Sequence, residues 1–324
     1  MTAPEASGRV DSGAGSGPRT APGAGPDRRP GPDRDPRPGP DRDPRPEDEW
    51  DRRISSAVAF LGRRLAGDYE VDEFGFDREL TERVFHPLLR RLHRDWFRTE
   101  VFGTEHLPAE GAALVVANHS GTIALDALML SVTVHDAHAR HLRTLGADLV
   151  FRAPILSELA RKSGATVACA ADAERLLGGG RLVAVFPEGF KGVGKPYPKR
   201  YQLQRFGRGG FVAAALRTGA PIVPVAIVGA EETYPMLADV KPLARLLGLP
   251  YFPVTPTFPW LGPLGLVPLP SKWLIEFCPP VPTAGLAEQA DDPLVVFSLA
   301  DQVRDTIQHT LHKLLARRPD PFGG

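Results

Sequence analysis

The chain has 324 residues, enough for one large domain or two small ones, and 42% of them are hydrophobic. Its 39 Lys and Arg residues balance 39 Asp and Glu residues, which argues against a nucleic-acid-binding protein. Two cysteines, Cys169 and Cys278, are too few for a disulfide framework and fit a reducing compartment.

Residues 1–49 are dominated by Pro, Gly, Asp and Arg. Residues 31–38 read GPDRDPRP, and residues 39–46 repeat that sequence. Such a composition offers little apolar surface to offset the entropy of ordering the chain. It also lacks the apolar stretch of a secretory signal. We predict a disordered, solvated tail, with partner binding by the repeat as the alternative.

Residues 50–98 are predicted to form N-terminal helices, one over residues 50–66 and one over residues 77–98. The second carries an apolar stripe at helical spacing with arginines around it. This helix either packs its stripe on the following domain or lies on an anionic membrane surface. The apolar residues are Phe85, Leu88, Leu89, Leu92 and Trp96, and the arginines are Arg83, Arg90, Arg91, Arg94 and Arg98.

From Val101 onward the pattern alternates between strands and helices. This alternation predicts an α/β domain over residues 99–290, with a mostly parallel central sheet flanked by helices. Residues 291–324 are predicted to form an amphipathic C-terminal helix packed on that domain. The predicted strands are 112–117, 142–145, 165–169, 181–186, 222–228 and 273–277, and the predicted helices are 124–134, 155–163, 171–177 and 210–218.

A polar turn, residues 118–122, follows the first buried strand and contains His119. A histidine with a nearby carboxylate is suited to general-base chemistry, because the carboxylate fixes the tautomer of the imidazole. The nearest candidate is Asp126, seven positions later. On a continuous helix that carboxylate would lie about 10 Å away along the axis. We therefore expect Ser120, Gly121 and Thr122 to form a loop before the helix begins.

Three sequence motifs together resemble the glycerolipid acyltransferase family. Residues 116–126 read VANHSGTIALD, residues 183–189 read VAVFPEG, and residues 220–227 read APIVPVAI. The family carries an Asn-His-x4-Asp turn, a Phe-Pro-Glu-Gly turn and a Val-Pro-Val strand in this order. The resemblance covers roughly residues 97–285, and the chain departs from it in having six residues between His119 and Asp126.

The resemblance implies a transferase that moves a fatty acyl group from a thioester to the hydroxyl of a glycerolipid or lysophospholipid. His119 would deprotonate the hydroxyl and Asp126 would orient His119. Acyl-CoA, or an acyl carrier thioester, would be the co-substrate, and neither a metal nor a redox cofactor is implied. The residues assigned to substrate binding are Asn118, Ser120, Gly121, Phe186, Pro187, Glu188 and Gly189.

A basic segment follows the Glu188 turn and ends in glycines at the start of a predicted helix. Its cations Lys191, Lys195 and Arg208 are candidates for contacts with a phosphate of coenzyme A or of a lipid headgroup. The family's phosphate-binding arginine has no counterpart in residues 164–172. The acceptor therefore stays open between a lysolipid, a neutral glyceride and a glycerol phosphate.

The sequence leaves three alternatives. Residues 189–195 match the G-x4-G-K loop of nucleotidases, but Pro196 stands where a Ser or Thr should reach magnesium. A non-catalytic lipid-binding module on the same fold is the second alternative. A metal site at His135, His138 and His141 is the third, but three-residue steps spread ligands around a helix, and no HExxH motif occurs.

Residues 246–271 carry no charge but contain seven prolines. That proline density excludes a membrane-spanning helix. The segment is either an exposed apolar surface for lipid or a buried loop with extended, polyproline-like backbone. We expect a cytoplasmic protein that associates peripherally with the membrane surface.

Overall fold

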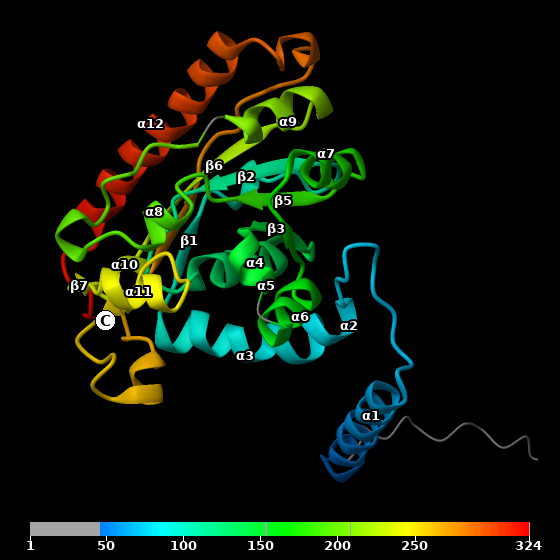
Figure 1. Ribbon diagram of the computed structural model, residues 1–324. Helices are drawn as coiled ribbons and strands as arrows, with labels where there is room; N and C mark the ends of the chain where they lie inside the picture. The colour runs from blue at the N-terminus through cyan, green and yellow to red at the C-terminus, as the bar shows by residue number, and fades with distance from the viewer. Residues whose placement is uncertain (1–45, 153, 208, 324) are drawn as a thin grey trace, which may run out of the picture. The chain divides into compact units, whose positions relative to one another are not determined.

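The computed structural model describes residues 46–152, 154–207 and 209–323 (Figure 1). The predicted tail falls almost entirely on residues 1–45, outside this set. The chain divides into two compact units, Met1–Asp68 and Tyr69–Gly324. In the first unit the structure describes helix α1 (Pro46–Ala66), which confirms the helix expected over residues 50–66. The domain boundaries assigned from the sequence, at residues 50–98, 99–290 and 291–324, stay a prediction.

The second unit is built on a seven-stranded sheet with the order β1-β9-β6-β2-β5-β3-β4. Neighbouring strands are parallel except β6 and β9, which run antiparallel. The predicted α/β fold with a mostly parallel sheet is thus confirmed. The strands are β1 (Glu100–Phe102), β2 (Ala113–Ala117), β3 (Leu142–Gly146), β4 (Ala165–Val167), β5 (Leu182–Val185), β6 (Ile222–Val228) and β9 (Leu274–Phe277), and a separate ribbon pairs β7 (Ala238–Asp239) with β8 (Pro253–Val254).

The centre of the sheet contains β2 and β6, the strands with continuous apolar sequence. Every residue of β2 and β6 is buried, as expected for uninterrupted apolar strands covered on both faces. Strand β2 lies between β5 and β6, with Val116 opposite Val185 and Pro224. Because these three strands are parallel, their carboxyl ends meet at one edge of the sheet.

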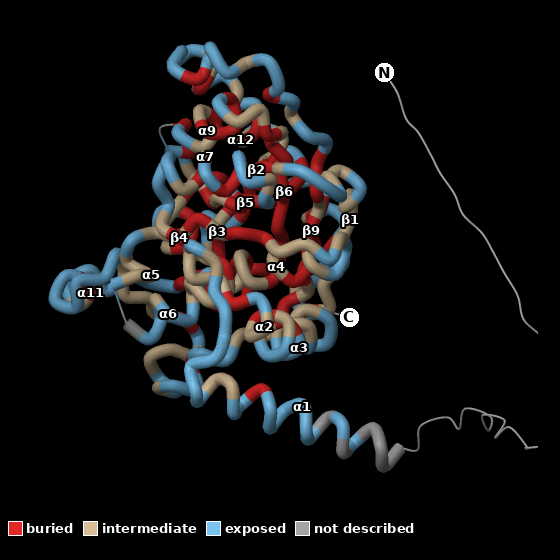
Figure 2. Tube along the Cα trace, turned by 90° about the vertical axis from the view of Figure 1, so that its right-hand side faces the viewer, coloured by how far each residue is buried: buried red, intermediate tan, exposed pale blue. Residues whose placement is uncertain are grey.

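Helices cover both faces of the sheet (Figures 1 and 2). Helices α7, α9 and α12 pack on one face, where Val303, Ile307 and Leu311 of α12 join the core cluster of Ile222 and Val228. The predicted packing of the C-terminal helix is confirmed. The helices of this unit include α4 (Leu125–His138), α5 (Asp148–Arg152), α6 (Pro154–Lys162), α7 (Ala170–Gly178), α8 (Phe190–Val193), α9 (Gly210–Thr218), α10 (Ala230–Thr233), α11 (Lys241–Leu246) and α12 (Pro293–Arg317).

Helix α4 and a helical run over residues 78–96 cover the opposite face. In this run, a π-helical turn at Thr81–Phe85 joins α2 (Arg78–Leu80) to α3 (His86–Arg91), and a second one at Leu92–Trp96 follows α3. The Asp77 carboxylate caps the start of the run by accepting from the amide of Leu80 at 2.9 Å. Leu89 and Leu92 pack against the core, whereas Leu88 is 67% exposed. The apolar stripe therefore serves domain packing at Leu89 and Leu92.

Candidate active site

The His119 turn lies where β2 ends at the carboxyl edge of the sheet. The Nδ1 atom of His119 lies 2.8 Å from Oδ2 of Asp126, the second residue of α4. The Asp126 side chain is fully buried, and that of His119 is 14% exposed. Asp126 also accepts from the amides of Ser120 and Ala127 at 2.9 Å each. The carboxylate is thus fixed in place, and the imidazole stays accessible from one side.

A loop between β2 and α4 brings the two side chains together despite the long spacing. Gly121 (φ 92°) and Thr122 (φ 63°) both adopt left-handed backbone, and α4 begins only at Leu125. A Cβ atom on Gly121 would lie 2.5 Å from the carbonyl oxygen of Ala230, so a glycine is required there. The Thr122 hydroxyl donates to the carbonyl of Tyr234 at 2.8 Å. The predicted loop is confirmed.

Glu188 follows β5, the strand next to β2, and its carboxylate points inward. Its Oε1 accepts from the backbone amide of His119 at 3.0 Å, and its Oε2 accepts from the amide of Gln204 at 2.6 Å. The residue is 3% exposed. Glu188 therefore ties the His119 turn to the following loop. The adjoining Gly189 (φ 55°) begins the short helix α8, next to the half-buried Pro187.

Three other residues of these turns are buried around His119. The Asn118 side chain donates to the carbonyl of Ile227 at 2.9 Å and accepts from its amide at 2.8 Å, which joins the end of β2 to β6. The Phe186 ring lies 4.6 Å from the His119 ring, centroid to centroid. The Ser120 hydroxyl is buried without a hydrogen-bond partner among the described residues. Asn118 and Phe186 thus support the histidine.

Lys195 occupies a buried position between two carboxylates. Its Nζ lies 3.2 Å from Oε1 of Glu231 and 3.6 Å from Oε2 of Glu188, and its side chain is 2% exposed. Burial raises the pKa of Glu231 to about 7, although Lys195 and the amide of Tyr201 act in the opposite direction. This geometry leaves Lys195 facing the protein interior, in contrast to the phosphate contact expected from the sequence.

The remaining predicted phosphate contacts have different outcomes. Lys191 is exposed on α8. Arg208 lies outside the described residues. The G-x4-G-K segment, residues 189–195, forms the four-residue helix Phe190–Val193, and its lysine, Lys195, is paired with Glu231. This geometry gives the nucleotidase alternative no support.

Sequence reasoning missed Glu231, which pairs with Lys195, and Tyr251, which bonds the His119 loop. Glu231 follows the end of β6 at the edge where His119 and Glu188 lie, and that shared edge is the signal that could have identified it. The Tyr251 hydroxyl donates to the carbonyl of Thr122 at 2.5 Å. Burial, with a smaller effect of the Asp126 charge, raises the pKa of Tyr251 well above its usual value. No periodic pattern marks Tyr251 in the sequence.

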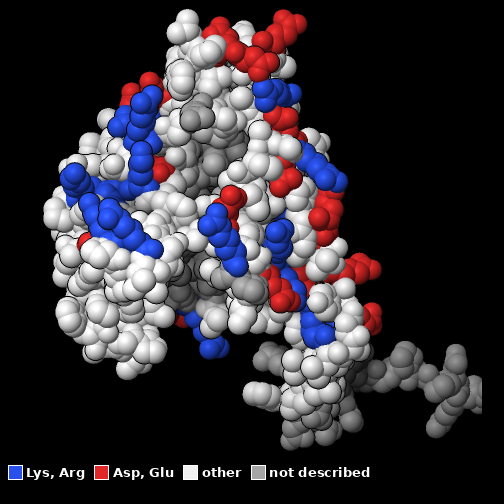
Figure 3. Space-filling view, in the orientation of Figure 1, with Lys and Arg blue, Asp and Glu red and all other residues white. Residues whose placement is uncertain are grey.

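The uncharged proline-rich segment, residues 246–271, has both exposed and buried parts. Tyr251 packs toward the His119 loop, and Gly265 is buried. A row of apolar side chains near its end is at least half exposed: Trp260 72%, Leu261 55%, Leu264 69%, Leu266 53% and Val267 50%. Figure 3 shows no Lys, Arg, Asp or Glu over this region, at the lower left of the molecule.

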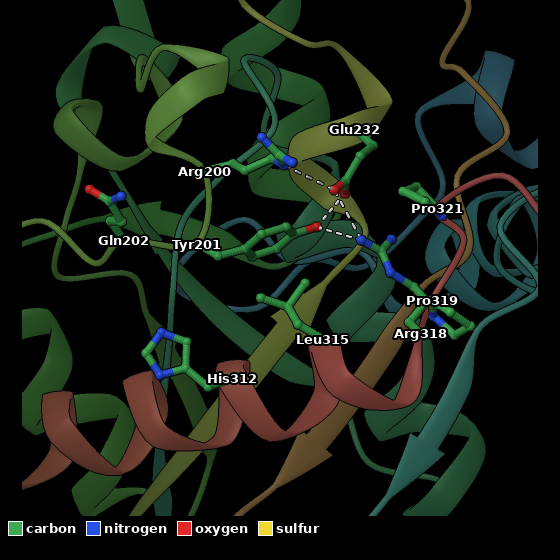
Figure 4. Close-up of a pocket in the computed structure, with 9 residues that line it drawn as sticks. All are labelled: Arg200, Tyr201, Gln202, Glu232, His312, Leu315, Arg318, Pro319 and Pro321. Carbon is green, nitrogen blue, oxygen red and sulfur yellow. Dashed lines mark hydrogen bonds and ion pairs between the residues drawn. The ribbon is translucent and has the colours of Figure 1, made fainter.

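A cavity of about 460 Å³ lies beside the C-terminal end of α12 (Figure 4). The Glu232 carboxylate accepts from the Tyr201 hydroxyl and from the guanidinium of Arg318, the latter at 3.0 Å. The Tyr201 hydroxyl in turn accepts from the amide of Gly229 at 2.9 Å. This internally paired network joins the end of β6 to the C-terminal segment. None of the residues that line this cavity is a predicted site residue.

Comparison with known proteins places this geometry in a family. Residues 98–228 match the family described as Acyltransferase. The chain is 61% identical over 274 residues to the uncharacterized protein Rv0502 of Mycobacterium tuberculosis, covering 84% of this chain and 76% of that protein. It is 58% identical over 279 residues to the uncharacterized protein ML2427 of Mycobacterium leprae, covering 85% and 76%.

Two more distant matches have descriptive names. A DGAT1/2-independent enzyme synthesizing storage lipids from Bos taurus is 24% identical over 223 residues, which cover 67% of this chain and 60% of that enzyme. The crystal structure of the 1-acyl-sn-glycerophosphate (LPA) acyltransferase PlsC from Thermotoga maritima matches with 19% identity and a TM-score of 0.48, covering 72% of this chain and 78% of that one. On the family match and the close relatives, the chain belongs to the acyltransferase family.

Proposed function

We propose that the protein transfers a fatty acyl group from a thioester, acyl-CoA or an acyl carrier thioester, to a lipid hydroxyl. The observation that carries this proposal is the 2.8 Å contact between Nδ1 of His119 and the buried Asp126 carboxylate. That contact places the imidazole proton on Nδ1 and leaves the Nε2 lone pair to act as the base.

The reaction needs one proton carrier. His119 Nε2 takes the proton of the acceptor hydroxyl as its oxygen attacks the thioester carbonyl carbon. The tetrahedral intermediate then collapses, the carbon–sulfur bond breaks, and the leaving thiolate receives the proton from His119. Asp126 stabilises the transient imidazolium and keeps its ring in place. Glu188 and Asn118 act as positioning residues, because they hold the backbone of the His119 turn.

For the acceptor, we propose a lysophospholipid or a neutral glyceride. Three of the arginines around residues 164–172 support this choice, because they already contact other side chains. Arg143 is buried and paired with Asp72, Arg161 stacks on Phe151, and Arg175 pairs with Glu73. The similarity to a bovine enzyme named for storage-lipid synthesis also fits a glyceride. Lys191, exposed on α8 near the His119 turn, is the proposed contact for a donor phosphate.

The test is an acyl-transfer assay with purified protein, labelled acyl-CoA and a panel of lysophospholipids, mono- and diglycerides and glycerol 3-phosphate. His119→Ala is assayed beside the parent, with circular dichroism to verify its fold. Loss of the general base should lower kcat on the order of 100- to 10,000-fold. His138→Ala is the matched control, because that histidine bonds the carbonyl of Thr104, away from Asp126.

Each outcome of the panel decides one part of the proposal. Transfer to a lysophospholipid or glyceride that His119→Ala abolishes supports both the reaction and the acceptor. Transfer to glycerol 3-phosphate alone contradicts the acceptor class but keeps the reaction. Equal rates for parent and His119→Ala contradict the role of His119. If the protein binds lipid but transfers no acyl group from either acyl-CoA or an acyl carrier protein thioester, a non-catalytic lipid-binding module would be favoured.

A further inference from the structure

Three histidines meet on the far side of α4 from the acyl-transfer site. His86 begins α3, His135 lies in the last turn of α4, and His141 directly precedes β3. One ring nitrogen from each lies within 4.8 Å of the other two. Because α4 ends at His138, His141 is not on that helix, so the helical spacing that argued against a metal site does not apply. The His138 ring instead lies 2.8 Å from the carbonyl oxygen of Thr104.

His86 is the most unusual member of this cluster. It is 1% exposed, and neither of its ring nitrogens has a hydrogen-bond partner among the described residues. Its ring centroid lies 4.3 Å from that of His135 and 5.8 Å from that of His141. Ring packing does not satisfy a buried nitrogen lone pair, and such a group is costly unless something binds it.

Glu82, one helical turn before His86, lies beside two of these histidines and becomes a fourth ligand when it leaves Arg78, whose Nε donates to its Oε1 at 2.8 Å. The same Oε1 lies 2.9 Å from Nε2 of His141 and 4.0 Å from Nε2 of His135. On the other side of the His135 ring, Nη2 of Arg90 donates to Nδ1 at 3.1 Å, and Arg90 also pairs with Asp136. Imidazole nitrogens and a carboxylate oxygen are donor types that tetrahedral zinc takes in proteins.

We propose that His86, His135, His141 and Glu82 bind a divalent transition-metal ion of the zinc class. Nitrogens on one tetrahedral zinc lie about 3.3 Å apart, so the rings must close in by roughly 1.5 Å through side-chain rotation. The ion would join the helical run of residues 78–96 to α4 and β3. Its role is structural, because His135 lies nine residues from Asp126 on α4, or about 13 Å along the helix axis.

The proposal is tested by titrating the metal-free full chain with Co²⁺ and following the visible absorption bands of tetrahedral cobalt. We expect one equivalent of Co²⁺ to bind and Zn²⁺ to displace it. In metal sites, mutating a residue that supports a ligand lowers metal affinity about 10- to 100-fold. His135→Ala and His141→Ala each remove a ligand itself, so each should lower the affinity for Co²⁺ at least about 100-fold. His138→Ala is the matched control and should bind as the parent does.

Thermal unfolding supplies a second readout that is independent of acyl transfer. Zn²⁺ at 100 times its Kd should raise the Tm of the parent and of His138→Ala by about 5 °C or more, and that of His141→Ala little. Failure of the parent to bind Co²⁺ and Zn²⁺ at one equivalent overturns the proposal. Binding that is unchanged in both His135→Ala and His141→Ala overturns it too. Neither result depends on whether the buried His86→Ala variant folds.

Discussion

The imidazole of His119 depends on one buried carboxylate for its orientation. Asp126 is held in turn by the amides of Ser120 and Ala127, so it belongs to the loop as much as to helix α4. An amide in place of this carboxylate can keep the shape of the site. It cannot enforce the same tautomer or stabilise an imidazolium.

For Asp126→Asn we expect kcat for acyl transfer to fall on the order of 100-fold or more, with a smaller change in KM. Steady-state kinetics with the acceptor that the substrate panel selects measure the effect. Asp301→Asn, an exposed change on α12, is the control and should keep the parent rate. An Asp126→Asn variant with parental kcat would show that His119 does not need this carboxylate.

Gly121 sets the path of the loop that brings His119 and Asp126 together. In Gly121→Ala, both the φ of 92° and the 2.5 Å approach to the Ala230 carbonyl oppose the new methyl group. We expect a loss of about 2–4 kcal/mol in the free energy of unfolding, measured by urea denaturation.

Gly111→Ala separates the two causes, because Gly111 has a φ of 78° with no atom within 4 Å of the added Cβ. That control should lose only about 1 kcal/mol. Equal losses in the two variants would show that backbone conformation, and not contact with Ala230, is what requires glycine at position 121.

At the scale of elements, the ends of β2, β5 and β6 are joined by buried charges. Glu188 follows β5, Glu231 lies in α10 directly after β6, and Lys195 in the loop after α8 lies between them. A buried ion pair adds little net stability, but removing one partner is costly, because it leaves the other charge buried without compensation.

We expect Lys195→Met to lower the free energy of unfolding by about 3–5 kcal/mol, and the exposed Lys191→Met by less than about 0.5 kcal/mol. The penalty should increase with pH. Glu231 has a folded pKa of about 7, above its value of 4.5 in the unfolded chain, so its protonated form is favoured in the folded state and stability is lost as the pH rises through 7.

Removing Lys195 raises the pKa of Glu231 further, since the lysine is the charge that lowers it. Denaturation curves at pH 6 and pH 8 should therefore show the larger difference between parent and Lys195→Met at pH 8. A penalty that is equal at the two pH values would exclude Glu231 as the source, and would leave the lost packing of the lysine stem.

At the scale of the whole molecule, the question is how the protein would reach the lipid acceptor proposed above. None of the helices that the structure describes is long and apolar enough to cross a bilayer. The exposed apolar row from Trp260 to Val267 lies in a segment without charge (Figure 3). Exposed apolar surface of this kind is typical of interaction sites, so we propose that this row contacts the membrane surface.

The double variant Trp260→Ser with Leu264→Ser should bind vesicles of phosphatidylcholine and phosphatidylglycerol at least 10-fold more weakly than the parent in a flotation assay. Leu294→Ser is the control, because Leu294 is 81% exposed on α12, outside this segment. Its vesicle binding should equal that of the parent. If the double variant also binds as the parent does, another surface makes the membrane contact.

The sequence alone determined the core strands and the turns that follow them. Strands β2, β5 and β6 are uninterrupted apolar runs, and strand β6 coincides with the predicted residues 222–228. The His119 and Glu188 turns follow two of these strands, so their meeting at one edge followed from parallel pairing. Such features are local in the chain, or follow from one rule of topology, and they can be predicted without coordinates.

Tertiary structure alone decided which side chains face one another across long sequence separations. Lys195 resembles a surface cation in sequence, and its burial depends on Glu231, 36 positions later. His86 lies in a different helix from His135, and the two meet because the helical run of residues 78–96 packs beside α4. The antiparallel direction of β9 is likewise set by its partner β6. Local periodicity tells which face of an element is buried, but the packing of distant elements selects its neighbours.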